Sequence, residues 1–269
     1  MITYRNLGRL GRFGNELFQY AGTRLYAHLN GFSSTFPAWE GSREIFEYIT
    51  SWTPAERCKA SLLPTIQLND VRNRSPLQRI GEILHVSSRT TMQNLWEKPR
   101  DQINIYGYLQ DPHSLELLSQ HRDTVRSWFR FSVDLETACR DACRDVPRWT
   151  AVHLRRGDFV KRGLALPIDV YIDRLRKDGI ANPLYIASDD PSIAAHFKEF
   201  APCKPNVPPG VSAIAFDFWM LAKAQKIYGC GSTFSWWGAY LSGHDSYISP
   251  SLTHTWPSGY SPILSTQHL

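Results

Sequence analysis

The sequence predicts an α/β fold built on a parallel sheet, and it does so most clearly in its second half. Strand-like and helix-like stretches alternate from about Trp149 onward, at the lengths typical of strand–helix–strand units. A polar cluster directly follows each of three predicted strands, which is where open parallel sheets bind ligands. Of the 269 residues, 42% are hydrophobic and 20% are charged, a balance that supports a sizeable core and argues against disorder.

We expect two domains, an N-terminal one over 1–147 and a C-terminal one over 148–269. A chain of this length suits one large domain or two modest ones. The regular alternation begins near residue 149, whereas the stretch 36–105 mixes short apolar pieces with Pro, Asn and Ser. This change of pattern places the boundary between 147 and 148.

The first half contains fewer predicted elements. Residues 1–4 suggest a short strand, and a glycine-punctuated turn follows it. A hydrophobic residue then recurs every four positions, at Leu17, Ala21, Leu25 and Leu29. This spacing predicts a helix, with Asn15 as its N-cap and Asn30 near its end. Further on, 103–109 is predicted to be a strand and 112–131 a helix.

The second half alternates regularly. Strands are predicted over 149–154, 183–188, 226–230 and 246–250. Helices are predicted over 168–178, 192–200, 216–225 and 234–243. The proline-rich stretch 202–210 is expected to be a surface connection.

Charge and cysteine usage narrow the function classes. The net charge of +5 and the pI of about 9.0 fit an anionic small ligand, a nucleic acid or an anionic membrane surface. No aromatic–basic pattern of a nucleic-acid module is present, so no nucleic-acid partner is expected. The five cysteines lack zinc spacing, which favours reduced thiols and no metal site. Neither a signal peptide nor a membrane-spanning stretch is predicted, so we expect a cytoplasmic protein.

The segment VHLRRGDFV (152–160) ends one predicted strand with adjacent arginines. Arg155 and Arg156 carry planar donor forks that match phosphate oxygens. Successive side chains on a strand point to opposite faces, so only one of them can face a given ligand. The other is expected to pair with a carboxylate such as Asp158. The alternative is that both are solvated loop arginines.

The segment GSTFS (231–235) marks the expected start of a helix. It contributes four candidate residues, namely Ser232, Thr233, Phe234 and Ser235. Backbone N–H groups and hydroxyls at a helix start can bind an anion, and Gly231 allows a ligand to approach the backbone. The alternative is simple N-capping by Ser or Thr.

Three further residues complete the candidate site. Asp189 and Asp190 could accept hydrogen bonds from a base or a ribose, or one of them could serve the following turn. His153 is either a hydrogen-bonded core histidine or a ligand contact. Parallel strands end at one sheet edge, so all three polar clusters are expected to meet there. Neither a P-loop nor a dinucleotide-binding glycine motif is present.

Five blocks resemble a known family. They are GRFGNELFQYAG (11–22), GYLQ (107–110), VHLRRGDF (152–159), YIASDD (185–190) and GSTFSWWGAYLSG (231–243). Their order and content resemble the α-1,2-fucosyltransferases, glycosyltransferase family 11, from residue 11 to about 250. The arginine-bearing block also resembles the motif of the wider superfamily with α-1,6- and protein O-fucosyltransferases.

This resemblance implies a GT-B-like fold, with two Rossmann-like α/β domains facing a cleft. The implied reaction is inverting transfer of L-fucose from GDP-fucose, without a metal or other cofactor, to the 2-hydroxyl of a terminal galactose in a glycan. The alternatives are a protein O-fucosyltransferase, another GDP-sugar transferase, or an inactive protein that binds nucleotide or glycan. If the glycan is lipid-linked, the enzyme would work peripherally at the inner membrane face.

The resemblance also implies roles for single residues. Arg156 would bind the diphosphate, with Arg155 nearby, and Asp189 or Asp190 would hold the guanine. The rest of the donor side would be His153, Ser232, Thr233, Phe234 and Ser235. The acceptor and sugar side would be Arg12, Gly14, Asn15 and Glu16. The catalytic residues would be Arg156, Asp158 and Asn15. Glu16 stands where the family usually has Gln, and both Asp158 and Glu16 are candidates for the general base.

Overall fold

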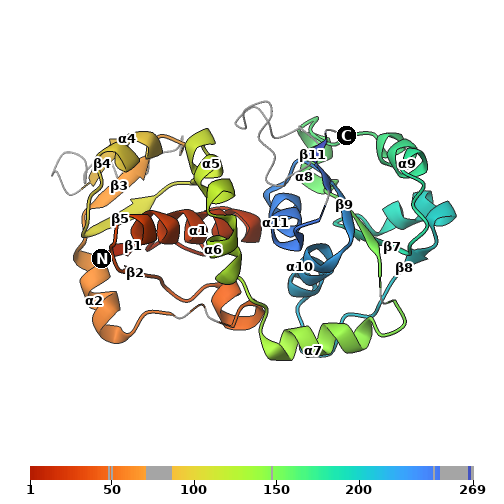
Figure 1. Cartoon of the computed structure of the whole chain (residues 1–269), viewed down its shortest axis with the longest axis horizontal. Helices are drawn as coiled ribbons and strands as arrows, with labels where there is room; N and C mark the ends of the chain where they lie inside the picture. Colours follow the sequence, from red (N-terminus) through yellow and green to blue (C-terminus); the bar gives the residue numbers. More distant parts are fainter. Residues whose placement is uncertain are drawn as a thin grey trace. The chain divides into compact units, whose positions relative to one another are not determined.

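The chain folds into two compact α/β units, Met1–Arg130 and Phe131–Leu269. The computed structural model describes residues 1–47, 49, 51–70, 87–146, 148–244, 246–248 and 266–267. All strand pairs within these ranges are parallel. A parallel α/β fold, as the sequence predicts, is therefore present in both units (Figure 1).

The first unit is built on a five-stranded sheet of order β2-β1-β5-β3-β4. Its strands are β1 (Ile2–Thr3), β2 (Ser34–Thr35), β3 (Thr65–Leu68), β4 (Ser87–Thr90) and β5 (Ile103–Tyr106). Its helices are α1 (Phe13–Leu29), the π-helix η1 (Gly41–Ile45), α2 (Pro54–Leu62), α4 (Met92–Glu97), α5 (Pro112–Gln120) and α6 (Arg122–Ser127). The predicted strand at 103–109 is thus confirmed, though shorter.

Two predictions in this unit need correction. Asn15 does not cap the long helix, because α1 already begins at Phe13 and its N-cap is Arg12, in an extended conformation. Asn30 does end the helix as expected, and its amide donates to the carbonyl of Tyr26 over 2.8 Å. The single helix predicted over 112–131 is divided into α5 and α6 at His121.

The second unit is built on a six-stranded sheet of order β11-β10-β9-β6-β7-β8. Its strands are β6 (Thr150–Leu154), β7 (Leu184–Ser188), β8 (Pro202–Cys203), β9 (Lys226–Gly229), β10 (Ser246–Ile248) and β11 (Thr266–Gln267). Its helices are α7 (Val133–Ala142), α8 (Gly157–Lys161), α9 (Ile168–Lys177), the 3-10 helix η2 (Pro191–Phe200), α10 (Ala213–Lys223) and α11 (Thr233–Ser242). The regular alternation predicted for this half is confirmed, while positions 249–250 of the last predicted strand lie outside the described residues.

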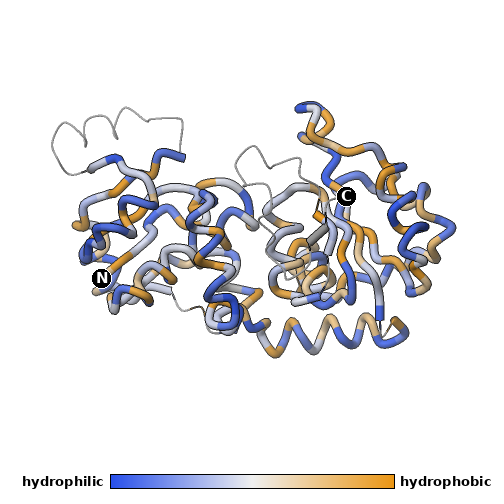
Figure 2. The backbone as a smooth tube through the Cα atoms, turned by 45° about the horizontal axis from the view of Figure 1, so that its top comes forward, coloured by the Kyte–Doolittle hydropathy of each residue, from blue (hydrophilic) through white to orange (hydrophobic). Residues whose placement is uncertain are grey.

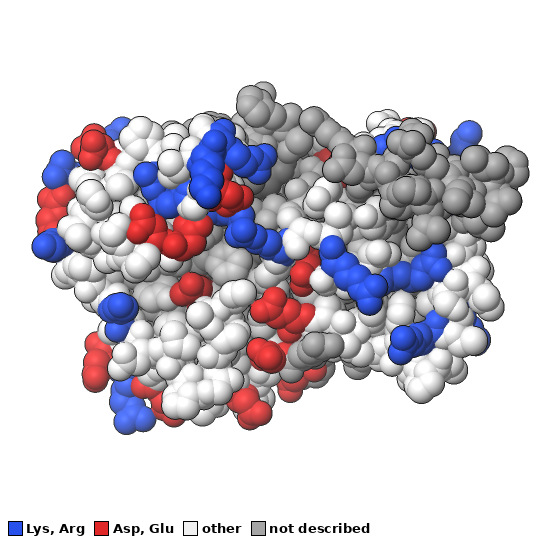
Figure 3. Space-filling view, turned by 180° about the vertical axis from the view of Figure 1, so that it is seen from behind, with Lys and Arg blue, Asp and Glu red and all other residues white. Residues whose placement is uncertain are grey.

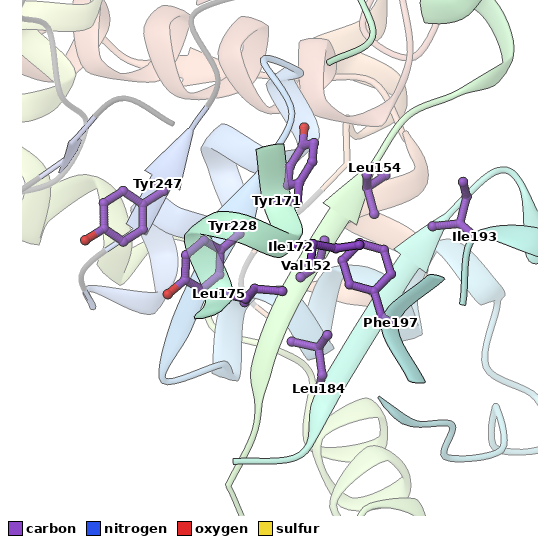
Figure 4. Close-up of a cluster of buried hydrophobic side chains, with 10 residues drawn as sticks. All are labelled: Val152, Leu154, Tyr171, Ile172, Leu175, Leu184, Ile193, Phe197, Tyr228 and Tyr247. Carbon is purple, nitrogen blue, oxygen red and sulfur yellow. The ribbon is translucent and has the colours of Figure 1, made fainter. Parts of the chain in front are cut away.

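One face of the second sheet packs on α9 and η2. This core consists of Val152, Leu154, Leu184, Tyr228 and Tyr247 from the strands, with Tyr171, Ile172, Leu175, Ile193 and Phe197 from the helices (Figure 4). Because side chains alternate along a strand, His153 of β6 and Tyr185 of β7 point to the other face. That face is covered by α10 and α11. The tryptophans of α11, Trp236 and Trp237, are buried core residues.

The helix α7 explains why the second unit begins earlier than the predicted boundary at 147/148. Its hydrophobic and hydrophilic residues alternate along the helix (Figure 2), which is the pattern of an element packed on one side. Glu136 of α7 accepts a 2.8 Å hydrogen bond from the indole of Trp219 and pairs with Lys223 at 3.0 Å, both on α10. The first compact unit therefore ends at Arg130 and the second begins at Phe131. Residue 147, the last residue of the predicted N-terminal domain, lies outside the described residues.

On the face drawn in Figure 3, basic and acidic side chains lie among one another. Within the described residues, no helix combines the length and the apolar character needed to cross a lipid bilayer.

Candidate functional site

The three predicted polar clusters meet at one edge of the second sheet. Strands β9, β6 and β7 are adjacent and parallel, so residues 153–158, 189–190 and 230–235 all follow carboxyl ends. Hydrogen bonds join them: among others, the backbone of Arg156 donates to Asp189, and the ring of His153 contacts the hydroxyl of Ser235. A crevice outside the carboxyl ends of parallel strands is the usual ligand site of such sheets.

Arg155 is neutralised by a neighbour. Its Nε and Nη2 donate to the two carboxylate oxygens of Asp158 over 2.7 and 2.9 Å, and its guanidinium lies 5.0 Å from the ring centre of Phe159. This forked ion pair ties the end of β6 to α8. The sequence predicted such a role for one of the two arginines.

Arg156 differs from its neighbour. Its guanidinium donates to the carbonyl of Leu166 over 3.2 Å, and no acidic side chain of the described residues forms an ion pair with it. It is half-buried and lies close enough to Tyr171 and Asp190 to influence both electrostatically. A partly desolvated, unneutralised guanidinium is well suited to bind an anion.

Asp189 holds the backbone that carries Arg156. Its carboxylate accepts the N–H of Arg156 over 2.6 Å and the N–H of Gly157 over 3.1 Å. A Cβ on Gly157 would lie 2.9 Å from the same carboxylate, so glycine is required for this close approach. The oxygens predicted to hold guanine are therefore already occupied by the backbone of the arginine loop.

Asp190 is also engaged locally. It is the N-cap of η2 and accepts from the N–H and the hydroxyl of Ser192 over 3.0 and 2.6 Å. These hydrogen bonds from Ser192, followed by the charge of Arg156, hold the pKa of Asp190 below its usual value. The turn role that the sequence left open is the one observed for this residue.

His153 and the start of α11 form a compact polar cluster. The ring Nδ1 lies 2.5 Å from the hydroxyl of Ser235 and 3.4 Å from that of Ser232. Ser232 caps α11 by accepting the N–H of Ser235 over 3.2 Å, and the ring of Phe234 lies 5.2 Å from that of His153. The predicted capping role of Ser232 is thus observed, at a helix start whose first N–H groups can still bind an anion.

Cys230 adds a thiol that the sequence reasoning did not assign to the site. Its sulfur lies 3.7 Å from both Nδ1 of His153 and the hydroxyl of Ser235, and the residue is buried. Burial by itself would raise the pKa of this thiol. The charge of His153 and the hydrogen bonds of the cluster outweigh that effect and lower the pKa to about 7.

We therefore expect a thiolate to form at Cys230 near neutral pH. The ultraviolet absorbance of the thiolate, recorded against pH, should contain a step centred near 7, and Cys230→Ser should remove it. Cys139→Ser is the matched control, because burial raises the pKa of that thiol to about 12. A titration near neutral pH that survives in Cys230→Ser would contradict the assignment.

Asp217 of α10 is a second residue that the sequence did not single out. It accepts a 2.5 Å hydrogen bond from the hydroxyl of Tyr185. Burial raises the pKa of Asp217, whereas the hydrogen bond from Tyr185 and the charge of His153 oppose the shift. The carboxylate therefore lies on the same sheet face as His153. Its signal in the sequence is an acidic residue inside an otherwise apolar helix.

The acceptor-side residues predicted from the sequence lie in the first unit, where β1 ends. Gly11 has a φ of 91°, and a Cβ there would lie 2.3 Å from Nδ2 of Asn15. The carbonyl of the exposed Arg12 accepts the N–H of Asn15 over 2.7 Å, and Gly14 is buried in the first turn of α1. Gln110, which follows β5, donates to Oδ1 of Asn15 over 2.8 Å.

The turn that carries Gln110 is held by a buried carboxylate. Asp70, which follows β3, accepts the N–H groups of Tyr108 and Leu109 over 2.8 and 3.0 Å. Leu109 has a φ of 54°, a conformation that is strained for a residue other than glycine. Burial raises the pKa of Asp70 to about 6. Sequence reasoning missed Asp70, and a lone Asp in a loop gives no signal of such a role.

Metal ligation was not expected from the sequence. Across the ranges that the structure describes, no three His, Cys, Asp or Glu side chains come together in a way that could hold a metal ion.

Two curated proteins resemble the chain in sequence, and no protein-family model matches it. The O-antigen biosynthesis glycosyltransferase WbnK of Escherichia coli is 29% identical over 163 residues, which cover 54% of this chain and 52% of WbnK. An alpha-1,2-colitosyltransferase of Escherichia coli is 28% identical over 145 residues, which cover 48% of this chain and 49% of that protein. Each match therefore spans about half the length of the curated relative.

Solved structures resemble a larger share of the chain. POFUT1 in complex with GDP-fucose has a TM-score of 0.57 at 14% identity, covering 90% of this chain and 94% of that one. The NodZ alpha-1,6-fucosyltransferase, known from Bradyrhizobium, has a TM-score of 0.54 at 12% identity, covering 90% and 92%. This chain is a distant homologue of bacterial glycosyltransferases and has the fold of POFUT1 and NodZ. The GT-B-like α/β class and the fucosyltransferase resemblance predicted from the sequence are confirmed at this level.

Proposed function

We propose that this protein transfers L-fucose from GDP-fucose to a hydroxyl group of a glycan, with inversion at the anomeric carbon. The observation that carries the proposal is the contrast between the two arginines after β6. Arg155 is neutralised by Asp158, whereas the guanidinium of Arg156 has no ion-pair partner among the described residues and follows β6, whose neighbour β9 leads into α11 at the same sheet edge. Such an arrangement suits a diphosphate that gains negative charge as it departs.

The diphosphate would be bound from two sides. Arg156 supplies a planar donor fork, and the start of α11 supplies backbone N–H groups and the hydroxyl of Thr233. The hydroxyls of Ser232 and Ser235 are occupied within the cluster around His153, so they act by fixing the helix start and the ring. We therefore assign Ser232 and Ser235 to positioning rather than to direct phosphate binding.

The guanine would be read by Asp217 rather than by Asp189 or Asp190. Guanine presents two adjacent N–H donors, which a single carboxylate can accept. Both oxygens of Asp189 accept backbone N–H groups, and Asp190 uses Oδ1 to cap η2. Asp217 accepts at Oδ1 from a side chain, Tyr185, and its pKa responds to the charge of His153 in the candidate site.

The acceptor would be bound by the first unit, through Arg12, Asn15 and Glu16. An exposed arginine, an amide and a carboxylate are the groups that sugar hydroxyls commonly meet. The names of the two curated relatives support a glycan acceptor, and that of the colitosyltransferase supports an α-1,2 linkage. We propose the 2-hydroxyl of a terminal galactose as the site of transfer.

Purified protein incubated with GDP-fucose and a panel of β-galactosides tests this proposal. We expect GDP release in step with a fucosylated galactoside, and linkage analysis should place fucose on the 2-hydroxyl. Fucose attached to a peptide instead would favour a protein O-fucosyltransferase. Binding of GDP-fucose without turnover of any acceptor would mean that the chain is an inactive binding protein and would reject the proposal.

A second candidate is transfer of a related deoxysugar. It is favoured by the alpha-1,2-colitosyltransferase among the relatives, whose name specifies a donor sugar other than fucose. Running the same assay with GDP-colitose beside GDP-fucose decides between the two. A kcat/KM higher with colitose would replace fucose in the proposal.

Asp158 was a sequence candidate for the general base, and its geometry favours a supporting role. Both of its oxygens accept from Arg155. We expect Asp158→Asn to weaken this pair and to lower turnover less than tenfold, without moving the acid limb of the pH–rate profile. General bases contribute about 10²–10⁴-fold. A loss in that range, with a lost acid limb, would return Asp158 to the role of base.

A further inference from the structure

Polar groups also converge at the carboxyl edge of the first sheet. Its order places β2, β1 and β5 side by side. Glu40 follows β2, Glu16 lies in the first helical turn after β1, and Gln110 follows β5. Edges of this kind bind ligands in parallel α/β sheets, and the groups named here are two carboxyl groups and an amide.

Glu16 is the unusual member of this set. It is only 7% exposed, and within the part of the chain that the structure describes its Oε2 has no hydrogen-bond partner. A buried carboxylate oxygen without a partner is costly, so such a group usually meets a proton or a donor from a ligand. Its neighbour Asn15 is held in place by Gln110, which fixes the first turn of α1.

The surroundings of Glu16 keep its proton affinity high. Burial, followed by the negative charge of Glu40, raises the pKa of Glu16 to about 7. The pKa of Glu40 is itself raised by burial and by Glu44 on η1. About two turns along α1, Arg24 donates to the hydroxyl of Tyr20, while the first turn, which contains Glu16, lies at the positive end of the helix dipole.

We propose that Glu16 is the general base of the transfer reaction. This inference rests on the proposed function and names the residue that the acceptor hydroxyl would meet. The alternative is that Glu16 is a purely structural carboxyl group that stays protonated.

The acceptor hydroxyl oxygen forms a bond to C1 of fucose as the bond between C1 and the phosphate oxygen breaks. GDP departs with that electron pair, and the hydroxyl proton passes to Glu16. Water then takes this proton when the products leave. A base with a pKa near the working pH is well matched to this task.

The pH dependence has a defined sign. Glu16 acts when it is deprotonated, so kcat should fall as the pH drops below about 7 and level off above it. Removing the charge of Glu40 lowers the pKa of Glu16. In Glu40→Gln, the acid limb of the profile should therefore move to lower pH.

The experiment compares Glu16→Gln, Glu40→Gln and the exposed control Glu47→Gln, with GDP-fucose and lactose as probes. We expect Glu16→Gln to lose at least a hundredfold in kcat and to bind GDP as tightly as the wild type. Glu40→Gln should shift the acid limb, and Glu47→Gln should match the wild type in both respects. A wild type that transfers nothing contradicts the proposed function itself.

Two outcomes overturn only this inference. Turnover of Glu16→Gln within tenfold of the wild type, with an unshifted limb in Glu40→Gln, would make Glu16 a structural carboxyl group. Loss of GDP binding in Glu16→Gln would assign the residue to folding, since the donor site proposed above lies in the second unit.

Discussion

Arg156→Ala is expected to lower the rate of fucose transfer at least a hundredfold while the protein remains folded. Within the described residues, the guanidinium makes one hydrogen bond, to the carbonyl of Leu166, so its loss removes little that holds the fold. Removing one preorganised donor aimed at developing charge typically costs about 10²–10³ in kcat. The measurement is steady-state transfer by the variant, with circular dichroism and thermal unfolding as checks of folding.

Matched variants separate charge from geometry. Arg156→Lys keeps the charge but loses the planar fork, so it should recover only part of the activity. Arg162→Ala removes an exposed arginine at the end of the same short helix and should leave transfer unchanged. A folded Arg156→Ala variant with near-normal turnover would remove Arg156 from the donor site.

Asp189→Ala is expected to reduce both stability and transfer. Its carboxylate accepts two backbone N–H groups at the start of α8, as a helix cap does. Loss of a cap costs about 0.5–2 kcal/mol of the free energy of unfolding. Because one of these N–H groups belongs to Arg156, we also expect transfer to fall at least tenfold through misplacement of that residue.

Asp190→Ala is the control for Asp189→Ala. Asp190 caps η2 through Ser192 and does not contact the backbone of Arg156, so its loss should destabilise by a similar amount with a smaller effect on transfer. Urea unfolding gives the stability of each variant, and GDP binding by calorimetry reports the position of Arg156. Equal losses of transfer in both variants would contradict the positioning role of Asp189.

Features that depend on residues close together in the sequence could be predicted from the sequence. The strands around β6, β7 and β9 were predicted because their apolar runs and following polar clusters are contiguous in sequence. The capping role of Ser232 and the pairing of Arg155 with Asp158 also involve residues three positions apart. In contrast, α7 was missed, and its packing partners on α10 lie far along the chain.

The roles of single residues at the candidate sites depend on contacts between residues that are far apart in the sequence. Nothing in the local sequence of Asp189 indicates that it binds the backbone of Arg156, 33 positions away. Cys230 lies near His153 because β9 lies beside β6. Asp217 lies on the same sheet face as His153 because α10 packs there. The same holds for Glu16 and Glu40, which follow different strands of the first sheet.

The sequence by itself determined the α/β class, the polar edge of the second sheet and the resemblance to fucosyltransferases, because periodicity and contiguous motifs encode these features. Only the tertiary structure decided which charges are neutralised and which remain available. That choice depends on pairs such as Asp189 with the Arg156 backbone, and on the burial of Glu16. Desolvation and hydrogen bonding between distant segments set the charge of a group, and neither can be read from its immediate neighbours.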